Sequence, residues 1–206
     1  MARLKPLTSG QSTFALYKPF GVLSQFRSEG NRPGLETLSL GLPKDVWPVG
    51  RLDADSEGLL LLTSDMTLRA HLTEPQFGHS RTYDVQVEGE VTEEHLAQLT
   101  EPMALRINKR EVITKPAEAR GIEEPGWLPE RHPPIRFRKT IPTSWLQMVL
   151  REGKNRQVRR MTAAVGLPTL RLVRTAVGAL TLASLGIEAG ESTPLSSDQI
   201  KATRKS

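Results

Sequence analysis

The chain has 206 residues, of which 37% are hydrophobic, so it can form one globular domain or two subdomains that share a cleft. It has no cysteine, no metal-ligand spacing among its four histidines and no glycine-rich phosphate-binding motif. These absences exclude disulfides and thiolate catalysis, and we expect neither a metal nor a cofactor. The formal net charge is +5; no apolar run approaches the roughly 18 residues of a membrane span, and residues 1–11 lack a signal-peptide stretch. We therefore expect a cytoplasmic protein without a membrane partner.

The N-terminal part predicts one strand that a turn interrupts. Residues 1–11 are polar and irregular, which is typical of a disordered terminus. Thr13–Tyr17 alternates as a strand does, Lys18–Gly21 stops it, and Val22–Phe26 is expected to resume it. A short helix or turn follows at Leu35–Leu42.

Residues 47–65 combine an acidic turn with an apolar run. Their sequence is W-P-V-G-R-L-D-A-D-S-E-G-L-L-L-L-T-S-D. Val49–Leu52 is expected to be the end of a strand and Ala54–Gly58 a turn. Leu59–Thr63 is apolar almost throughout, which predicts a strand buried on both faces. If the first strand keeps its alternation, Arg51 and Asp53 point to the same side of it.

A carboxylate beside a guanidinium stays ionised, because a neighbouring positive charge lowers the pKa of a carboxyl group. Asp53 could then act as a nucleophile or base, although a strand-end salt bridge with Arg51 explains the same residues. A hydrolase is a further alternative, because residues 54–58 nearly spell the G-x-S-x-G elbow and Asp53, Asp55 and Glu57 could form a glycosidase-like set. However, a strand rather than a helix is expected to follow, and three acids on one turn are more typical of solvated turn residues.

The rest of the chain predicts strands separated by short helices. Prolines interrupt Gly121–Pro142, which is expected to be a loop or hairpin extension, and residues 197–206 read as a loose, polar tail. Helices are expected at Met66–Leu72, Thr92–Leu99 and Asn155–Val165. The first would be capped by Ser64 or Asp65 and the second by Thr92. Strands are expected at Arg81–Val87, Arg110–Ala119, Ser144–Leu150, Leu170–Arg174 and Gly178–Leu182.

Positive charge is concentrated in residues 131–174, which carry 11 Lys or Arg against one acid, Glu152. Such a segment favours a polyanion such as RNA as partner, although a solvated basic face is the simpler alternative. In the third helix, Arg156 and Arg160 lie opposite the apolar face, while Arg159 lies at its boundary and can reach inward. The residues expected to contact RNA are Arg131, Arg136, Arg138, Lys139, Lys154 and Arg160.

Two motifs carry a resemblance to a known family. Gly50-Arg51-Leu52-Asp53, Ser56, Gly58-Leu59-Leu60 and Thr63 resemble the signature G-R-L-D-x-x-[ST]-x-G-L-L-x-x-T of the RsuA-type pseudouridine synthases. The run from Glu152 to Met161, E-G-K-N-R-Q-V-R-R-M, is similar to a second motif of that family. With the opening Tyr-Lys-Pro-x-Gly and the closing strand, turn and Pro-Leu, the resemblance extends from about residue 13 to 195.

The resemblance implies a catalytic site. Asp53 matches the catalytic aspartate, Tyr83 matches the tyrosine that stacks in the uracil pocket, and Arg159 matches the basic residue that pairs with the aspartate. Arg51 is expected to brace the signature loop. The residues expected to bind the substrate are Arg51, Leu52, Arg156, Gln157, Leu172 and Arg174, and the resemblance implies that the Leu-x-Arg segment of residues 170–174 lines the pocket.

The resemblance also implies an α+β fold: a mixed, largely antiparallel sheet in two subdomains, with flanking helices and a central cleft. Residues 12–196 would form the catalytic domain, without a leading RNA-binding domain. The implied reaction is isomerisation of uridine to pseudouridine in large-subunit ribosomal RNA, by a monomer without cofactor. The alternative from another class is a non-catalytic ribosomal RNA-binding or ribosome assembly factor.

Overall fold

A computed structural model describes residues 13–135, 138 and 140–205. The predictions for residues 1–11, Arg136 and Lys139 lie outside this part of the chain. The strands are β1 (Thr13–Lys18), β2 (Trp47–Pro48), β3 (Glu57–Thr63), β4 (Arg81–Glu88), β5 (Ala104–Ile107), β6 (Arg110–Ile113), β7 (Glu118–Ile122), β8 (Thr143–Leu150), β9 (Thr169–Val177), β10 (Leu180–Thr181) and β11 (Ser192–Pro194). The helices are α1 (Met66–Thr73), α2 (Glu93–Thr100), α3 (Gln157–Ala164) and α4 (Ser197–Ala202), with 3-10 turns η1 (Leu35–Leu38), η2 (Pro75–Phe77) and η3 (Ala183–Leu185).

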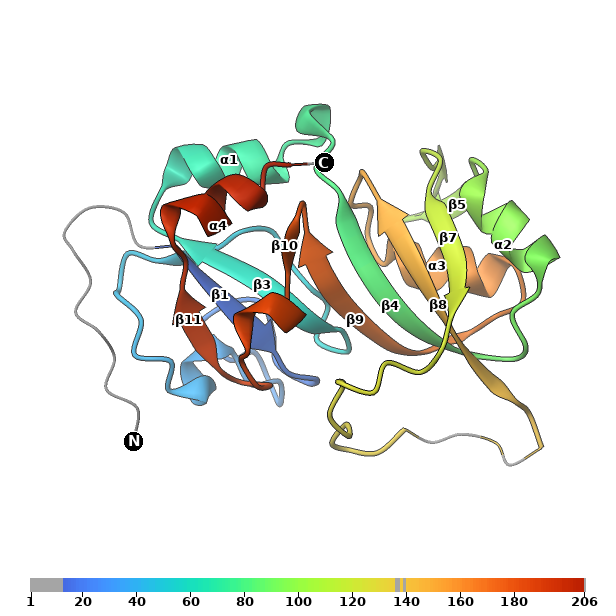
Figure 1. Ribbon diagram of the computed structural model, residues 1–206, viewed down its shortest axis with the longest axis horizontal. Helices are drawn as coiled ribbons and strands as arrows, with labels where there is room; N and C mark the ends of the chain where they lie inside the picture. Colours follow the sequence, from blue (N-terminus) through green and yellow to red (C-terminus); the bar gives the residue numbers. More distant parts are fainter. Residues whose placement is uncertain (1–12, 136–137, 139, 206) are drawn as a thin grey trace.

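One mixed sheet runs through the molecule in the order β11-β1-β3-β9-β4-β8-β7, with β2 beside β3 and β10 beside β9 (Figure 1). The β3–β9 pair is parallel, and the other pairs along this path are antiparallel. Helices α1 and α4 lie beside the β1–β3 half, and α2 and α3 lie beside the β4–β8 half (Figure 1). The predicted α+β fold, with a mostly antiparallel sheet, two subdomains and flanking helices, is confirmed.

The parallel pair that joins the two halves is short and tight. Its register places Glu57 beside Val173 and Gly58 beside Arg174. Gly58 has φ +107°, and a Cβ atom there would lie 2.3 Å from the carbonyl oxygen of Arg174. Only glycine allows the two backbones to approach this closely in this conformation.

Strand β3 is buried at every position, as its apolar run predicts. Leu59 and Leu61 pack in the cluster that contains Leu68 and Leu72 of α1. Leu60 and Leu62 face the opposite cluster, which is built from β1 and the loops around it. A third cluster lies between β4, β8, α2 and α3 and fills the other half of the molecule.

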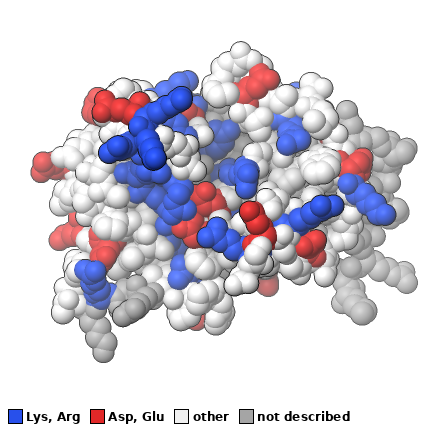
Figure 2. Space-filling view, turned by 180° about the vertical axis from the view of Figure 1, so that it is seen from behind, with Lys and Arg blue, Asp and Glu red and all other residues white. Residues whose placement is uncertain are grey.

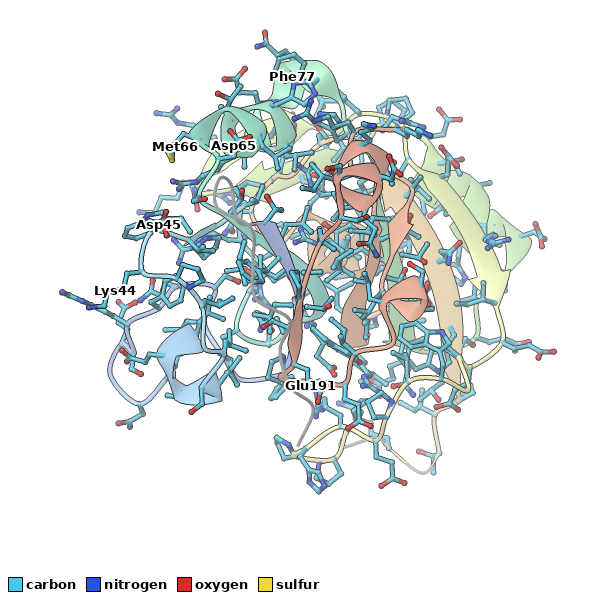
Figure 3. All side chains as sticks on the ribbon, turned by 60° about the vertical axis from the view of Figure 1, so that its left-hand side comes forward. Lys44, Asp45, Asp65, Met66, Phe77 and Glu191 are labelled. Carbon is cyan, nitrogen blue, oxygen red and sulfur yellow. The ribbon has the colours of Figure 1, made fainter. Side chains whose placement is uncertain are left out.

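Two predicted helix caps are confirmed. Asp65 accepts hydrogen bonds from the backbone N–H groups of Thr67 and Leu68 and begins α1 (Figure 3). Thr92 caps α2 in a reciprocal arrangement with His95. Both caps satisfy N–H groups that the first turn of a helix leaves without partners.

Three predictions about strands are wrong. Residues 22–26 form no strand, because Leu23 bonds across the loop to Pro33 and Ser24 to Leu52 instead of a neighbouring strand. Strand β2 ends at Pro48, so its alternation does not continue to residues 51 and 53. The strand expected at 110–119 divides into β6 and β7, and β6 pairs with the unpredicted β5.

The prediction of a loose tail at 197–206 is also wrong for the described residues. Ser196 and Gln199 form a capping box that begins α4. Ile200 and Ala202 pack against the core beside α1, and Thr203 is only 1% exposed. The described helices include none that is long and apolar enough to cross a membrane.

Candidate active site

A central cleft of about 1100 Å³ lies where the two halves of the sheet meet. Its walls come from the loop between β2 and β3, from β4 and β9, and from the loop that precedes α3. Figure 2 shows Lys and Arg side chains gathered around the hollow on this face. The residues expected in the site that line the cleft are Arg51, Leu52, Asp53, Tyr83, Lys154, Arg156, Gln157, Leu172 and Arg174.

The loop between β2 and β3 presents Asp53 to the cleft. Ser24 fixes the loop at Leu52, since its hydroxyl donates to the Leu52 carbonyl at 2.8 Å and accepts from the Leu52 N–H at 2.9 Å. Leu52 is buried in the hydrophobic cluster next to β1. Asp53 follows it at the rim, with a side chain that is 35% exposed.

Arg156 is the ion-pair partner of Asp53. Its Nη1 atom lies 3.4 Å from a carboxylate oxygen of Asp53, and its two terminal nitrogens donate to the Asp55 carboxylate at 3.0 and 2.8 Å. Burial alone would raise the pKa of Asp55. The hydrogen bond from Arg156 and the charges of Arg159 and Arg156 outweigh burial and hold that pKa below its usual value. Among the described residues Asp53 pairs with Arg156 and not with Arg51, so the alternative of a strand-end salt bridge with Arg51 is wrong, although Arg51 lines the same cleft.

The backbone of Arg156 is strained. It caps α3 with φ +51° and ψ +35°, a left-handed conformation that non-glycine residues rarely adopt. Such conformations persist where surrounding contacts determine them, and they are common at functional sites. Here the conformation accompanies the bidentate bond that fixes the guanidinium beside both carboxylates.

Arg159 does not make the expected ion pair with Asp53. Its Nη2 atom donates to the backbone carbonyl of Asp55 at 2.6 Å, and its Nε atom lies 3.5 Å from the Asp55 carboxylate. Its Nη1 atom reaches the carbonyl of Thr169 at 3.4 Å. The side chain does reach inward as predicted, with 12% exposure, but it braces the loop instead of lining the cleft.

Tyr83, Leu172 and Arg174 form the wall on β4 and β9. Tyr83 lies opposite Arg174 in the sheet register and packs against the cores of both halves. Arg174 is 4% exposed, and its Nε atom donates to the carbonyl of Leu59 at 2.8 Å. Burial lowers the pKa of Arg174, although a hydrogen bond with Tyr83 opposes this effect.

Glu152 and Gln157 fix the loop that precedes α3. The buried carboxylate of Glu152 accepts from Lys154 Nζ at 2.6 Å, from Gln157 Nε2 at 2.6 Å and from the Lys115 N–H at 2.8 Å. Gln157 also accepts from the Lys154 N–H at 3.0 Å. Gln157 was expected to bind substrate. Its amide instead holds the loop that shapes the cleft, through hydrogen bonds to Glu152 and Lys154.

Three other basic residues expected to bind RNA lie outside the cleft: Arg131, Arg138 and Arg160. Arg131 stacks over Phe20, 4.2 Å from the ring centroid, and donates to carbonyls of its own loop. Arg138 pairs with Glu88 at 3.6 Å. Arg160 donates to the carbonyls of Asn155 and Arg106. Phe20 does line the cleft, so Arg131 ties the extension to the cleft rim.

Sequence reasoning missed Lys18. Its amine is completely buried behind the loop and donates to the carbonyls of Val22 at 2.6 Å, Pro19 at 2.9 Å and Ala54 at 3.5 Å. Burial lowers the pKa of Lys18 to about 8, although the charges of Glu57, Asp55 and Asp53 oppose this. A lysine placed directly after an apolar strand was the available signal.

Sequence reasoning also misread Glu57 as a solvated turn residue. Glu57 is 3% exposed, and it accepts from Arg171 Nε at 2.9 Å and Nη2 at 2.8 Å. Ser56 is 1% exposed and begins no helix, because β3 follows it. The hydrolase elbow is therefore wrong. Among the described residues, none of the His, Asp and Glu side chains form a group that could hold a metal.

Comparison with known proteins agrees with this geometry. The family model described as RNA pseudouridylate synthase matches residues 12–164. The chain is 52% identical to Ribosomal large subunit pseudouridine synthase E of Xanthomonas axonopodis pv. citri over 79% of this chain and 84% of the relative. It is 32% identical to Ribosomal large subunit pseudouridine synthase B of Bacillus subtilis over 93% of this chain and 70% of the relative.

A solved structure supports the same assignment. A crystal structure of a pseudouridylate synthase superposes with a TM-score of 0.72 at 27% identity, covering 94% of this chain and 74% of the other. The resemblance to RsuA-type pseudouridine synthases is thus confirmed, as is the expectation of an RNA pseudouridine synthase enzyme. With a matching family model over most of its length, the chain belongs to the RNA pseudouridylate synthase family.

Proposed function

We propose that this enzyme isomerises a uridine of large-subunit ribosomal RNA to pseudouridine, with Asp53 as the catalytic group. The observation that carries the proposal is the position of Asp53: a partly exposed carboxylate on the cleft wall, 3.4 Å from Arg156. Relatives at 52% and 32% identity carry names that specify the large ribosomal subunit, which supports this RNA as substrate. We expect the enzyme to act in the cytoplasm, as a monomer and without a cofactor.

The cleft is large enough for a nucleotide and its neighbours. Its volume of about 1100 Å³ exceeds what one base needs and lies slightly above the range of typical ligand sites. A uridine inside folded RNA must leave its stack to reach Asp53, so base flipping is part of the proposal. The basic side chains around the cleft would bind phosphates while the base is held inside.

Asp53 acts on the ribosyl-uracil unit either by adding to it covalently or by removing a ribose proton, so that the bond between ribose and N1 breaks. Uracil then turns and rejoins the ribose through carbon 5. The proton on carbon 5 leaves and N1 gains one, so no atom is lost or added overall. Tyr83, on the β4 wall of the cleft, would stack on the base during this rotation.

Asp53 and Asp55 have different roles in the proposed site. Asp55 holds Arg156 through two hydrogen bonds, and Arg159 fixes the Asp55 backbone. Arg156 therefore lies in a fixed position beside Asp53. Its distance of 3.4 Å from the Asp53 carboxylate is longer than an ordinary hydrogen bond, so it orients this group by charge. Asp53 keeps its oxygens available for the substrate, whereas Asp55, Arg156 and Arg159 act as positioning residues.

The test is incubation with unmodified large-subunit ribosomal RNA, followed by carbodiimide labelling and primer extension. We expect a new stop at one uridine with the wild-type enzyme, none with Asp53→Asn, and an unchanged stop with the exposed control Asp45→Asn (Figure 3). RNA binding should persist in Asp53→Asn. Tight binding without any stop on free RNA or on precursor particles would contradict the proposal and favour an assembly factor.

A further inference from the structure

A second hollow, of about 390 Å³, adjoins the active-site cleft. Gly78 and Arg151 line both cavities, so the two are continuous along the surface. The second hollow lies at one end of the sheet, where β8 ends at Val149 and Leu150 and where β7 begins opposite them at Glu118. Apart from Arg151, which also lines the cleft, none of its side chains has a task in the proposed reaction.

The hollow carries two exposed cations. The side chain of Arg151 is 43% exposed, and its guanidinium lies 3.6 Å from Glu118, whose side chain is 69% exposed. An exposed pair of this kind contributes little stability and can exchange for another anion. Lys115 is exposed, and no carboxylate of the described part of the chain lies within ion-pair distance of its amine.

Among the described residues, few acids lie close to these cations. Glu118 lines the second hollow, and Glu74 and Glu152 line the cleft beside it. Glu152 is buried and satisfied by three donors. Arg81, in the same wall of the cleft, adds a further cation and holds the carbonyl of Leu72 at 2.9 Å.

Glu152 fixes the position of the two cavities relative to each other. One of its oxygens accepts the backbone N–H of Lys115, which lines the second hollow, and the other accepts the amine of Lys154, which lines the cleft. A ligand that spans both cavities would therefore meet two backbone segments whose spacing is set before binding. This preorganisation reduces the entropy cost of binding an extended ligand.

We infer that a single RNA strand flanking the target uridine leaves the cleft over Gly78 and lies in this second hollow. Arg151 and Lys115 bind its phosphodiester groups, and Arg151 exchanges Glu118 for phosphate. A positively charged groove that follows the backbone is the usual way to bind single strands without sequence preference. The inference rests on the proposed function, because it takes RNA to be the substrate in the cleft.

The test measures binding of an oligouridylate of about 20 nucleotides by fluorescence anisotropy over a range of salt concentrations. Each lost phosphate contact should reduce the slope of log K against log salt by about 0.7, which is roughly a 5-fold loss of affinity at about 0.1 M salt. We expect this loss for Arg151→Gln and for Lys115→Gln. Arg151→Lys, which keeps the charge, should retain the wild-type slope.

Lys44→Gln is the matched control. Lys44 is exposed on the loop before β2, projects into solvent and lines neither cavity (Figure 3). Its slope should equal that of the wild type. Unchanged slopes for both Arg151→Gln and Lys115→Gln, or an equal loss in Lys44→Gln, would overturn the inference.

Pseudouridine formation by the wild-type enzyme separates this inference from the proposed function. If pseudouridine forms but the slopes do not change, the second hollow is not an RNA site. If no pseudouridine forms and the two variants still lose slope, the hollow binds RNA and the proposed reaction is wrong. Thermal melting of each variant verifies that a lost slope does not reflect unfolding.

Discussion

The buried pair of Glu57 and Arg171 allows a quantitative prediction. It joins β3 to β9 at the parallel contact between the two halves of the sheet, with two hydrogen bonds of 2.9 and 2.8 Å. The side chains are only 4% and 6% exposed. In Glu57→Gln the shape is nearly kept, but the guanidinium loses its counter-charge in a place that water does not reach.

Removing one partner of a buried ion pair costs about 3–5 kcal/mol, because the other charge stays buried without compensation. For a chain of this length each kcal/mol corresponds to about 2–4 °C in melting temperature. Glu57→Gln should therefore melt roughly 6–20 °C below the wild type in calorimetry. The exposed Glu90→Gln serves as control and should change the free energy of unfolding by less than about 0.5 kcal/mol.

A double-mutant cycle tests the reason for this loss. Arg171→Met should also destabilise, since it leaves the Glu57 carboxylate buried alone. The double variant Glu57→Gln/Arg171→Met removes both charges and should be more stable than the sum of the single losses predicts, by about 1–3 kcal/mol. Additive losses, or a Glu57→Gln variant as stable as Glu90→Gln, would refute the reasoning.

Two further predictions concern the sheet contact and the cleft. Gly58→Ala places a Cβ atom against the Arg174 carbonyl at a φ that alanine disfavours, so urea unfolding should show a loss of about 3 kcal/mol, while the exposed Gly126→Ala should be neutral. Asp55→Asn weakens the hold on Arg156 without removing Asp53. The rate of pseudouridine formation should fall by about 100-fold, and a wild-type rate would show that Asp55 does not position Arg156.

Local signals predicted much of the fold. The apolar run of β3 specified a strand buried on both faces, and the polar residues before α1 and α2 specified their caps. The prediction of a loose tail failed because α4 has few apolar residues, and its stability comes from packing against a core cluster and from a capping box. Ser196 followed by Gln199 was a signal that could have found this helix.

The candidate site was predicted as a set of residues but not as a set of contacts. The motifs brought Asp53, Tyr83 and Arg156 into the expected cleft. The partner of Asp53 could not be predicted from alternation along one strand, because Arg156 approaches from a loop about a hundred residues later and depends on how the two halves meet. Such contacts depend on the tertiary structure. A short motif names the residues of a site but does not say which of them touch.

Lys18 should make the stability of the protein depend on alkaline pH. Its pKa is about 8 in the folded state and near 10.5 when exposed, because burial penalises the ammonium. Between these values the unfolded chain binds more protons than the folded one, so stability should rise with pH through this window. At 1.36 kcal/mol per pH unit, the gap between the two pKa values corresponds to about 3 kcal/mol.

Lys18→Met isolates this contribution, since methionine keeps much of the apolar volume and does not titrate. The difference in unfolding free energy, wild type minus variant, should be constant below about pH 8 and should increase by about 3 kcal/mol toward pH 10.5. Tyr17, whose pKa burial and nearby Glu57 raise to about 12, titrates in both proteins and largely cancels in this difference. A difference that stays flat across the window would mean that Lys18 keeps its charge, held by Asp53, Asp55 and Glu57, at every pH tested.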